Sequence, residues 1–416
     1  MAGSARAVVI GGGIGGLAAA AALHGRGWEV TVLERARSLA PVGAGISLAP
    51  NALRALDVLG IGDEIRALAA WQGDGGLRTP SGRWLSRSSA EAATARFGDP
   101  MVLLPRATLV DRLAALLPPG SIRTGTTATV VDPGDRTRSA RVRTDTTAPA
   151  DPGDPAHPAT GHEELEAELV VGADGINSRV RAALFPGHPG PVYSGFTTWR
   201  LLIPVPGAAF ASHETWGRGH LWGTHPLKDG RVYAYAAAVT PAGGRAPDDE
   251  LAELLRRYGG WHHPVPAVLA AARPEDVLRH DVRHVATPLP AYHSGRVALL
   301  GDAAHAMPPT LGQGGNQAVE DAVVLAHHAA APAGDLAAYT AARLPRTTAI
   351  ARQAVRIARV NLASGRAAVA VRDTATAALS RLGPALFLRG FDGIADWRPP
   401  YAAGDVHAGE CQGRDT

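Results

Sequence analysis

The stretch RAVVIGGGIGGLAAAAALHGRGWEVTVLERA, residues 6–36, decides the fold of this chain. An apolar run from Ala7 to Ile10 meets a glycine turn, an alanine-rich helix follows to about Gly25, and a second strand ends at Glu34. A strand, a helix and a second strand within about 30 residues make a βαβ unit. The sequence therefore predicts an α/β fold that begins with this unit.

Three glycines of this unit, Gly11, Gly13 and Gly16, have the spacing G-x-G-x-x-G. The first permits a tight turn, the second lets a pyrophosphate approach the backbone, and the third lets helix and strand pack closely. Exposed N–H groups and the helix dipole favour the anion, and Glu34 can accept the ribose hydroxyls of an adenosine. The pattern indicates a dinucleotide site, with tight packing around no ligand as the alternative.

A second stretch, LLGDAAHAMPPTLGQGGNQAVEDAVVLA at residues 299–326, indicates which dinucleotide is bound. Asp302 ends a strand, where its carboxylate can bind the hydroxyls of a polyol chain, and residues 312–316 open a helix whose N–H groups need an acceptor. A reduced flavin carries negative charge along one edge of its ring, which suits a helix N-terminus, whereas nicotinamide has no comparable anion. No second G-x-G-x-x-G lies in a βαβ setting. We therefore predict FAD.

Three motifs occur in a characteristic order: GGGIGG, GADGINSRVR (residues 172–181) and GDAAHAMPPTLGQGGNQAVEDA. With them the chain resembles the single-component FAD-dependent aromatic hydroxylases, the family typified by para-hydroxybenzoate hydroxylase, over roughly residues 5–350. Within that family it looks most similar to urate, salicylate and 3-hydroxybenzoate 6-hydroxylases. The resemblance implies a Rossmann-like FAD-binding domain, an inserted β-sheet substrate domain and a C-terminal helical tail.

The glycine pattern and the resemblance together identify a set of cofactor-binding residues. In that set, Gly15, Glu34 and Arg35 match the adenosine side, while Ser47 and Arg106 match positions around the pyrophosphate and ribityl chain. The full set is Gly11, Gly13, Gly15, Gly16, Glu34, Arg35, Ser47, Arg106, Ala128, Asp174, Asp302, Gly312, Gln313, Gly314, Gly315 and Asn316.

The remaining members of the set have more specific implied roles. Ala128 matches a backbone contact near the adenine, Asp302 the ribityl-binding acid, and residues 312–316 the loop under the flavin. Asp174 and Gly175, in GADG, match a motif linked to both FAD and NAD(P)H handling. For Asp174 a turn residue that caps its neighbours is the alternative.

The resemblance also implies a reaction. NADPH or NADH binds transiently, reduces the flavin and leaves, which accounts for the missing second nucleotide fold. Reduced flavin then adds O2 to form a C4a-hydroperoxide that hydroxylates an aromatic or related electron-rich ring. The protein must exclude water around this intermediate and stabilise a phenolate or similar anion of the substrate.

Aromatic side chains gather in one part of an otherwise aromatic-poor chain. They predict either an aromatic-lined pocket for a flat, aromatic or polycyclic substrate or the core of a sheet, and by strand alternation Tyr233 shares a face with Tyr235. The aromatic residues are Tyr193, Phe196, Trp199, Trp216, Trp222, Tyr233 and Tyr235.

Arg200, Tyr233 and His225 are the substrate-side candidates for catalysis. Arg200 and Tyr233 align by resemblance with substrate-side positions, and an arginine can bind a carboxylate or phenolate bidentately; a surface ion pair is the alternative for Arg200. His220 and His225 are weaker candidates for a base. His305, in GDAAH, matches a histidine that the family uses for structural hydrogen bonding; a general base is the alternative for it, because a histidine can accept a proton near neutral pH. We assign no base.

The expected domains follow the change of pattern along the chain. The insertion begins where alternating strands replace the βαβ pattern, and a helical region and a tail follow the last glycine motif. The expected limits are 1–72, 100–185 and 286–335 for the FAD-binding domain, 73–99 and 186–285 for the substrate-binding sheet domain, 336–395 for the helical region and 396–416 for the tail.

Composition excludes several classes of function. The formal net charge is +3, Lys228 is the only lysine, and no basic stripe with interleaved aromatics indicates nucleic-acid binding. One cysteine, Cys411, permits no intramolecular disulfide, which fits a reducing compartment. We expect no signal peptide before the first strand, and no apolar run of about 20 residues predicts a membrane span. We expect a cytoplasmic monomer or homodimer without a metal site.

Other functions stay open at this point. A flavin-dependent oxidase or dehydrogenase would reduce its flavin from the substrate without NAD(P)H, and an epoxidase would use the same cofactor on a double bond. A non-catalytic flavin- or ligand-binding protein is a third alternative. A flavin-dependent halogenase is disfavoured, because TWRLLIP holds one tryptophan and the sole lysine lies in PLKDG. Secondary metabolism or aromatic catabolism is the expected setting.

Overall fold

The computed structural model describes residues 4–39, 44–68, 70, 75–146, 161–205, 210–329, 334–381 and 389–401. Cys411 and the tail from residue 402 lie outside the described residues. No helix in the described part is long and apolar enough to cross a membrane.

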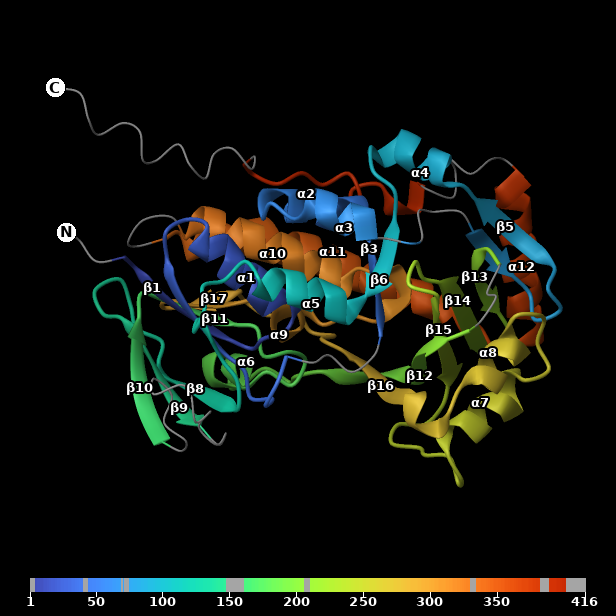
Figure 1. The fold of residues 1–416 in the computed structure, drawn as a ribbon, viewed down its shortest axis with the longest axis horizontal. Helices are drawn as coiled ribbons and strands as arrows, with labels where there is room; N and C mark the ends of the chain where they lie inside the picture. Colours follow the sequence, from blue (N-terminus) through green and yellow to red (C-terminus); the bar gives the residue numbers. More distant parts are fainter. Residues whose placement is uncertain are drawn as a thin grey trace.

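A six-stranded sheet lies in one half of the molecule, on the left in Figure 1. All neighbouring strands run parallel except the edge strand β17, which is antiparallel to β18. The βαβ unit predicted from residues 6–36 is confirmed, with α1 (Ile14–His24) between β1 (Arg6–Ile10) and the parallel strand β2 (Glu29–Leu33). The strands in order across the sheet are β17 (His293–Ser294), β18 (Val297–Leu299), β11 (Leu169–Gly172), β1 (Arg6–Ile10), β2 (Glu29–Leu33) and β7 (Ile122–Arg123).

Helices cover this sheet because its strands are apolar on both sides, as is typical of parallel sheets. Helix α1 presents no polar stripe: its residues from Leu17 to Leu23 are all buried. Figure 1 shows it grouped with the other covering helices, and α10 packs directly beside it. The other helices of this layer are α2 (Pro50–Val58), α3 (Gly62–Leu68), α5 (Arg106–Ala114), α10 (Gly314–His328) and α11 (Leu336–Asn361).

A seven-stranded sheet lies in the other half of the molecule, on the right in Figure 1. Its strands are antiparallel except for the parallel pair β13–β4. One face packs on α7 (Glu250–Tyr258) and α8 (Val265–Ala271) through a core that includes Trp199 and Trp222. The strands in order are β16 (Leu278–His284), β12 (Val192–Pro204), β15 (Arg231–Val239), β14 (His220–Pro226), β13 (Ser212–Trp216), β4 (Gly75–Arg78) and β5 (Trp84–Ser88).

Two smaller sheets accompany the two large ones. A two-stranded sheet brings β3 (Gly45–Leu48) beside β6 (Val102–Pro105), and an antiparallel sheet consists of β8 (Thr126–Asp132), β9 (Ala140–Thr146) and β10 (Gly161–Ala167). Short helices complete the part of the chain that the structure describes. They are α4 (Ala90–Phe97), α6 (Arg179–Leu184), α9 (Asp302–His305) and the 3-10 turns Pro274–Asp276, Pro309–Leu311 and Arg389–Phe391.

The C-terminal part is helical, as predicted. Helix α11 runs along α10, and α12 (Arg366–Arg381) packs against β5. Arg372 fastens α12 to the seven-stranded sheet and to the end of α11, because its guanidinium donates to the carbonyl of Gly217, which follows β13, at 3.1 Å and to that of Asn361 at 2.9 Å. The mixed α/β class and the helical C-terminus are therefore confirmed, whereas the exact domain limits stay a prediction.

Candidate active site

A cavity of about 660 Å³ lies between the carboxyl ends of the parallel strands, the N-terminus of α10 and the seven-stranded sheet, on the face opposite α7 and α8. Parallel sheets characteristically bind ligands at the carboxyl ends of their strands. All three motifs reach it: Gly13 follows β1, Gly175 follows β11 and Asp302 follows β18. The sequence motifs thus converge on one site although they lie far apart in the chain.

The three predicted glycine roles have direct geometric counterparts. Gly11 has φ 114°, and a Cβ there would lie 2.4 Å from the carbonyl oxygen of Ala173. A Cβ on Gly16 would lie 1.9 Å from the carbonyl oxygen of Gly11, whereas one on Gly13 would meet nothing within 4 Å. Gly11 and Gly16 therefore serve the turn and its packing, and Gly13 leaves open space on the cavity side.

Glu34 closes the same turn from the end of β2. Its two carboxylate oxygens accept hydrogen bonds from the N–H groups of Gly12 at 2.7 Å and Ala36 at 2.8 Å. Each oxygen keeps a second lone pair for a ribose hydroxyl. Arg35 follows directly and is exposed.

The N-terminus of α10 presents bare backbone to the cavity. Gly312 has φ 64°, in the left-handed region that favours glycine, and Gly314 and Gly315 line the cavity. A Cβ on Gly314 would lie 3.9 Å from an Asp302 carboxylate oxygen, and one on Gly315 would lie 2.9 Å from Ile46 Cδ1. A flat group with a negatively charged edge fits this surface, because unpaired N–H groups at a helix start attract anions.

Two residues of the same loop turn their side chains away from the cavity. Asn316 accepts from the Ala49 N–H at 2.8 Å and donates to the Ser47 carbonyl at 2.9 Å. Gln313 accepts from Asn51 at 3.1 Å in a buried polar cluster. Neither side chain lines the cavity, so these residues brace the loop around Ser47, and any contact they make with a cofactor is made by the backbone.

Asp174 caps a helix. Its Oδ2 accepts from the N–H groups of Arg179 at 2.7 Å and Val180 at 3.2 Å, at the start of α6. This is the geometry of the turn-capping alternative, and its Oδ1 has no partner among the described residues. Arg181 of the same motif donates to the carbonyl of Ala303 at 2.9 Å and so ties the second motif to the third.

Arg106 and Ser47 line the cavity, as does Asp302. Arg106 keeps accessible surface along the cavity wall, while desolvation by the surrounding protein lowers the pKa of its guanidinium and Asp302 partly opposes that change. Ala128 lies in β8 and does not line this cavity. The cofactor contacts of Ala128, Arg35, Gln313 and the others therefore stay predictions.

The three substrate-side candidates lie on the cavity floor. Arg200, His225 and Tyr233 all line the cavity, and no hydrogen bond or ion pair holds the Arg200 guanidinium among the described residues. Tyr233 lies over Gly45, where a Cβ would come within 2.6 Å of its ring, and burial raises its pKa. His225 stacks on Tyr233, and burial lowers its pKa to about 3.

The aromatic cluster divides between the two faces of the sheet. Phe196, Tyr233 and Tyr235 line the cavity, and the rings of the two tyrosines are 5.7 Å apart, on one face as predicted. Trp199 and Trp222 belong to the core under α7 and α8. Both alternatives drawn from the sequence therefore apply, to different members of the cluster.

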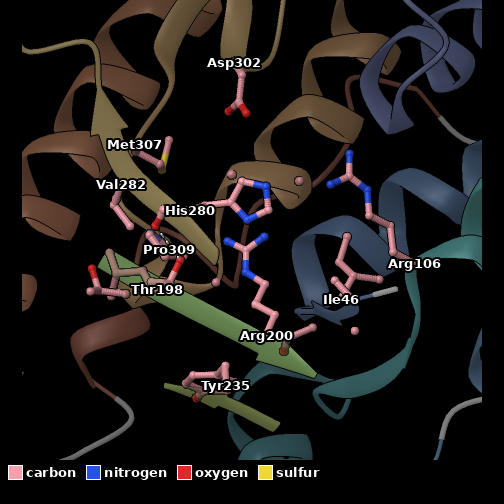
Figure 2. A pocket seen from close by; sticks show the side chains of 18 of the residues that line it. Ile46, Arg106, Thr198, Arg200, Tyr235, His280, Val282, Asp302, Met307 and Pro309 are labelled. Carbon is pink, nitrogen blue, oxygen red and sulfur yellow. Dashed lines mark hydrogen bonds between the residues drawn. The ribbon is translucent and has the colours of Figure 1, made fainter. Parts of the chain in front are cut away.

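Sequence reasoning missed His280, which extends from β16 into the cavity beside Arg200 (Figure 2). Burial and the positive charges of Arg200 and Arg279 lower the pKa of the His280 imidazole, which keeps it neutral near pH 7. The sequence carries no signal for this position, because only the pairing of β16 with β12 brings His280 opposite Thr198, two residues from Arg200.

His305 has a structural environment. Its Nε2 lies 2.5 Å from Asp321 Oδ2, and both side chains are buried. Asp321 also accepts from the Gly301 N–H at 2.9 Å and from Arg343 at 2.6 Å. His305 does not line the cavity, so the expected structural role is the one that its contacts support.

Comparison with known proteins now identifies the family. The family model described as FAD binding domain matches residues 4–354. The chain belongs to this FAD-binding family. It is 36% identical to the aurachin C monooxygenase/isomerase of Stigmatella aurantiaca, over 85% of this chain and 88% of the relative. It is 34% identical to the 3-amino-4-hydroxybenzoate 2-monooxygenase of Streptomyces cremeus, over 85% of this chain and 86% of the relative.

A solved structure supports the same family assignment. Klebsiella pneumoniae HpxO complexed with FAD and uric acid superposes with a TM-score of 0.78 and 26% identity, over 94% of this chain and 96% of that one. The protein is thus an FAD-dependent, NAD(P)H-consuming monooxygenase of the aromatic hydroxylase type, and the predicted family, cofactors and reaction class are confirmed.

Proposed function

We propose that this monooxygenase hydroxylates a planar aromatic or nitrogen-heteroaromatic ring that carries an ionisable hydroxyl group. The observation that carries the proposal is the Arg200 guanidinium, which lines the cavity without an ion-pair partner among the described residues. A cation held in this way can bind the oxyanion of a deprotonated ring, and charge-assisted hydrogen bonds are about twice as strong as neutral ones. A bound oxyanion donates electron density to its ring, which the reaction requires.

The cofactor would lie along the motif side of the cavity. In this arrangement the open space at Gly13 receives the pyrophosphate, Asp302 and Arg106 flank the ribityl chain, and the N-terminus of α10 receives the flavin ring. Bound FAD, once reduced by NAD(P)H, supplies the activation of dioxygen, which the side chains of the protein cannot provide. The chain supplies placement, charge and exclusion of water.

His280 is suited to take the hydroxyl proton. It lies beside Arg200 in Figure 2, and its lowered pKa keeps the imidazole able to accept a proton at neutral pH. In this proposal the substrate hydroxyl loses its proton to His280, and the resulting oxyanion is bound by Arg200. The two residues therefore hold the ring in its electron-rich form.

The cavity walls limit water at the reacting ring. Phe196, Leu221, Val282 and Met307 line the cavity with apolar side chains. Exclusion of water strengthens the interaction of Arg200 with an anion and prevents loss of reactive oxygen as peroxide. Two similar enzymes support a planar, ionisable ring, since by name one acts on 3-amino-4-hydroxybenzoate and the other on urate.

We further propose a cytoplasmic enzyme, because NAD(P)H is supplied there, acting as a monomer or homodimer within the domain limits expected from the sequence. Size-exclusion chromatography with light scattering determines the oligomeric state directly.

A panel of hydroxylated rings tests the function. The FAD-loaded enzyme is mixed with NADPH or NADH and with hydroxybenzoates, hydroxyquinolines and purines, while NAD(P)H loss and peroxide are both measured. We expect slow oxidation without a ring and a large stimulation, with little peroxide, by rings whose hydroxyl ionises. Stimulation by methyl ethers of the same rings to the same extent would contradict the role given to the oxyanion.

A further inference from the structure

One row of residues crosses the cavity floor from strand to strand. Arg200 of β12 pairs with Tyr235 of β15, Tyr235 pairs with Gly223 of β14, and Gly223 pairs with Glu214 of β13. Directly paired residues point to the same face of a sheet, and the side chains of Arg200, Tyr235 and Glu214 all line the cavity. The row therefore has a cation at one end and a carboxyl group at the other.

Gly223 lets the tyrosine span the gap within this row. A Cβ on Gly223 would lie only 2.2 Å from Cζ of Tyr235, so the tyrosine ring occupies the space that a side chain at position 223 would fill. The Tyr235 hydroxyl consequently passes over β14 and donates to Glu214 Oε2 at 2.7 Å. Tyr235 thus points away from Arg200 and toward the carboxyl end of the row.

Glu214 has no cationic partner among the described residues. Its Oε1 accepts from the indole N–H of Trp216, and its Oε2 accepts from Tyr235. Desolvation raises the pKa of this carboxyl, although both hydrogen bonds act in the opposite direction. Each carboxylate oxygen has more acceptor capacity than one bond uses, and a half-buried carboxyl without a cation gains from any further donor that enters the cavity.

We propose that Glu214 and Tyr235 form the specificity-determining pair for a hydrogen-bond donor, an N–H, amino or second hydroxyl group, on the substrate edge remote from the ionisable hydroxyl. This inference rests on the function proposed above, in which Arg200 binds the oxyanion. The substrate then spans the row, with its anionic edge at Arg200 and its donor edge at Glu214. A ring with an acceptor or a methyl group at the donor edge gives the carboxyl no further donor and binds less tightly.

Matched ligands separate this role from a purely structural one. The probes are 5-amino-2-hydroxybenzoate against 2-hydroxy-5-methylbenzoate, and 2,5-dihydroxybenzoate against 2-hydroxy-5-methoxybenzoate; each pair keeps an ionisable hydroxyl and differs in a donor para to it that is replaced by a methyl group or carries one. Dissociation constants are measured on the FAD-loaded enzyme from the change in flavin absorbance, without NAD(P)H. Binding is therefore measured independently of turnover.

The variants are Glu214→Gln and Tyr235→Phe, which keep the shape of each side chain. Glu250→Gln and Tyr258→Phe are matched controls on the opposite side of the same sheet. Glu250 also accepts an indole N–H, from Trp199 at 2.7 Å, and the buried Tyr258 hydroxyl also donates one hydrogen bond, to the Ala237 carbonyl at 2.9 Å.

The wild-type enzyme should prefer the donor-bearing member of at least one pair by about tenfold or more, the size expected when a buried polar group loses its partner. Both cavity variants should abolish that preference by weakening the donor-bearing member alone, and both controls should keep it. Equal weakening of both members, or no preference in the wild type, would overturn the inference while leaving the hydroxylase function intact. Binding of neither pair would overturn it as well, whereas failure of the proposed function would appear separately, as absence of ring-stimulated NAD(P)H oxidation.

Discussion

Replacing Gly13 by alanine separates the binding of the cofactor from the stability of the fold. Gly13 has φ −77° and ψ 178°, values that alanine adopts without strain. A Cβ at this position would meet no protein atom within 4 Å. The FAD-free Gly13→Ala protein should therefore unfold at the same denaturant concentration as the wild type.

The same methyl group occupies the space through which a pyrophosphate approaches the backbone. Loss of one hydrogen bond to a charged group costs about 1.5–3 kcal/mol, which corresponds to roughly 10- to 150-fold in the dissociation constant of FAD. Titration of the FAD-free protein, followed by quenching of flavin fluorescence, measures that constant. FAD affinity equal to that of the wild type would refute the position given to the pyrophosphate.

Gly16→Ala is the contrasting variant. Its Cβ would lie 1.9 Å from the Gly11 carbonyl oxygen, a backbone atom that has no room to move. Overpacking of this kind costs about 1–3 kcal/mol or more, and it acts whether or not FAD is bound. Gly16→Ala should thus destabilise the FAD-free protein, and an effect seen only on FAD affinity would show that the two glycines are not distinguished in this way.

Three further predictions concern the buried charges and the cavity floor. Arg343→Met removes a guanidinium held by the fully buried Glu320 and Asp321, so the unfolding free energy of the FAD-loaded protein should fall by about 3 kcal/mol in urea titration; a loss below about 1 kcal/mol would contradict this. Arg200→Lys keeps the charge but loses the planar fork, so KM for an ionised ring should rise about tenfold, with KM for NAD(P)H unchanged. His280→Gln should lower ring-stimulated turnover. It should also remove the fall of turnover at acidic pH, which the wild type should show below about pH 6.5 because a lowered pKa leaves the imidazole protonated only at more acidic pH. An unchanged pH profile would exclude His280 as the proton acceptor.

The parts of the site that were predictable from sequence are those in which local backbone geometry dictates the residue type. Gly11 and Gly16 are glycines because the carbonyl oxygens of Ala173 and Gly11 lie where a Cβ would be. The motif that contains them is therefore visible in the sequence. The same holds for the glycines that open α10, where Gly312 has a positive φ.

The parts that were not predictable depend on the register of distant strands. Glu214 and Tyr235 lie 21 residues apart and meet only because β14 lies between their strands. His280 likewise reaches Arg200 only through the pairing of β16 with β12. Alternation along one strand shows which residues share a face, but it does not show which residues of other strands lie opposite.

The buried polar cluster beneath α10 was missed for a related reason. Gln313 and Asn316 belong to a recognised motif, yet their side chains turn into the protein. Arg343, from α11, donates to Glu320 and Asp321 of α10. A charged residue in a helix normally predicts a solvent-exposed face, and only the packing of α11 on α10 converts these residues into a buried network.

The central claim is that this enzyme inserts one atom of dioxygen into an ionised aromatic ring. The most direct measurement supplies dioxygen labelled with the heavy isotope to the FAD-loaded enzyme, with NAD(P)H and a ring that stimulates its oxidation, and determines the mass of the product. We predict one labelled oxygen atom in each product molecule and a close match between product formed and NAD(P)H consumed. A product that carries no oxygen from the labelled gas, or flavin reduction by the ring without NAD(P)H, would contradict the claim and indicate an oxidase or dehydrogenase.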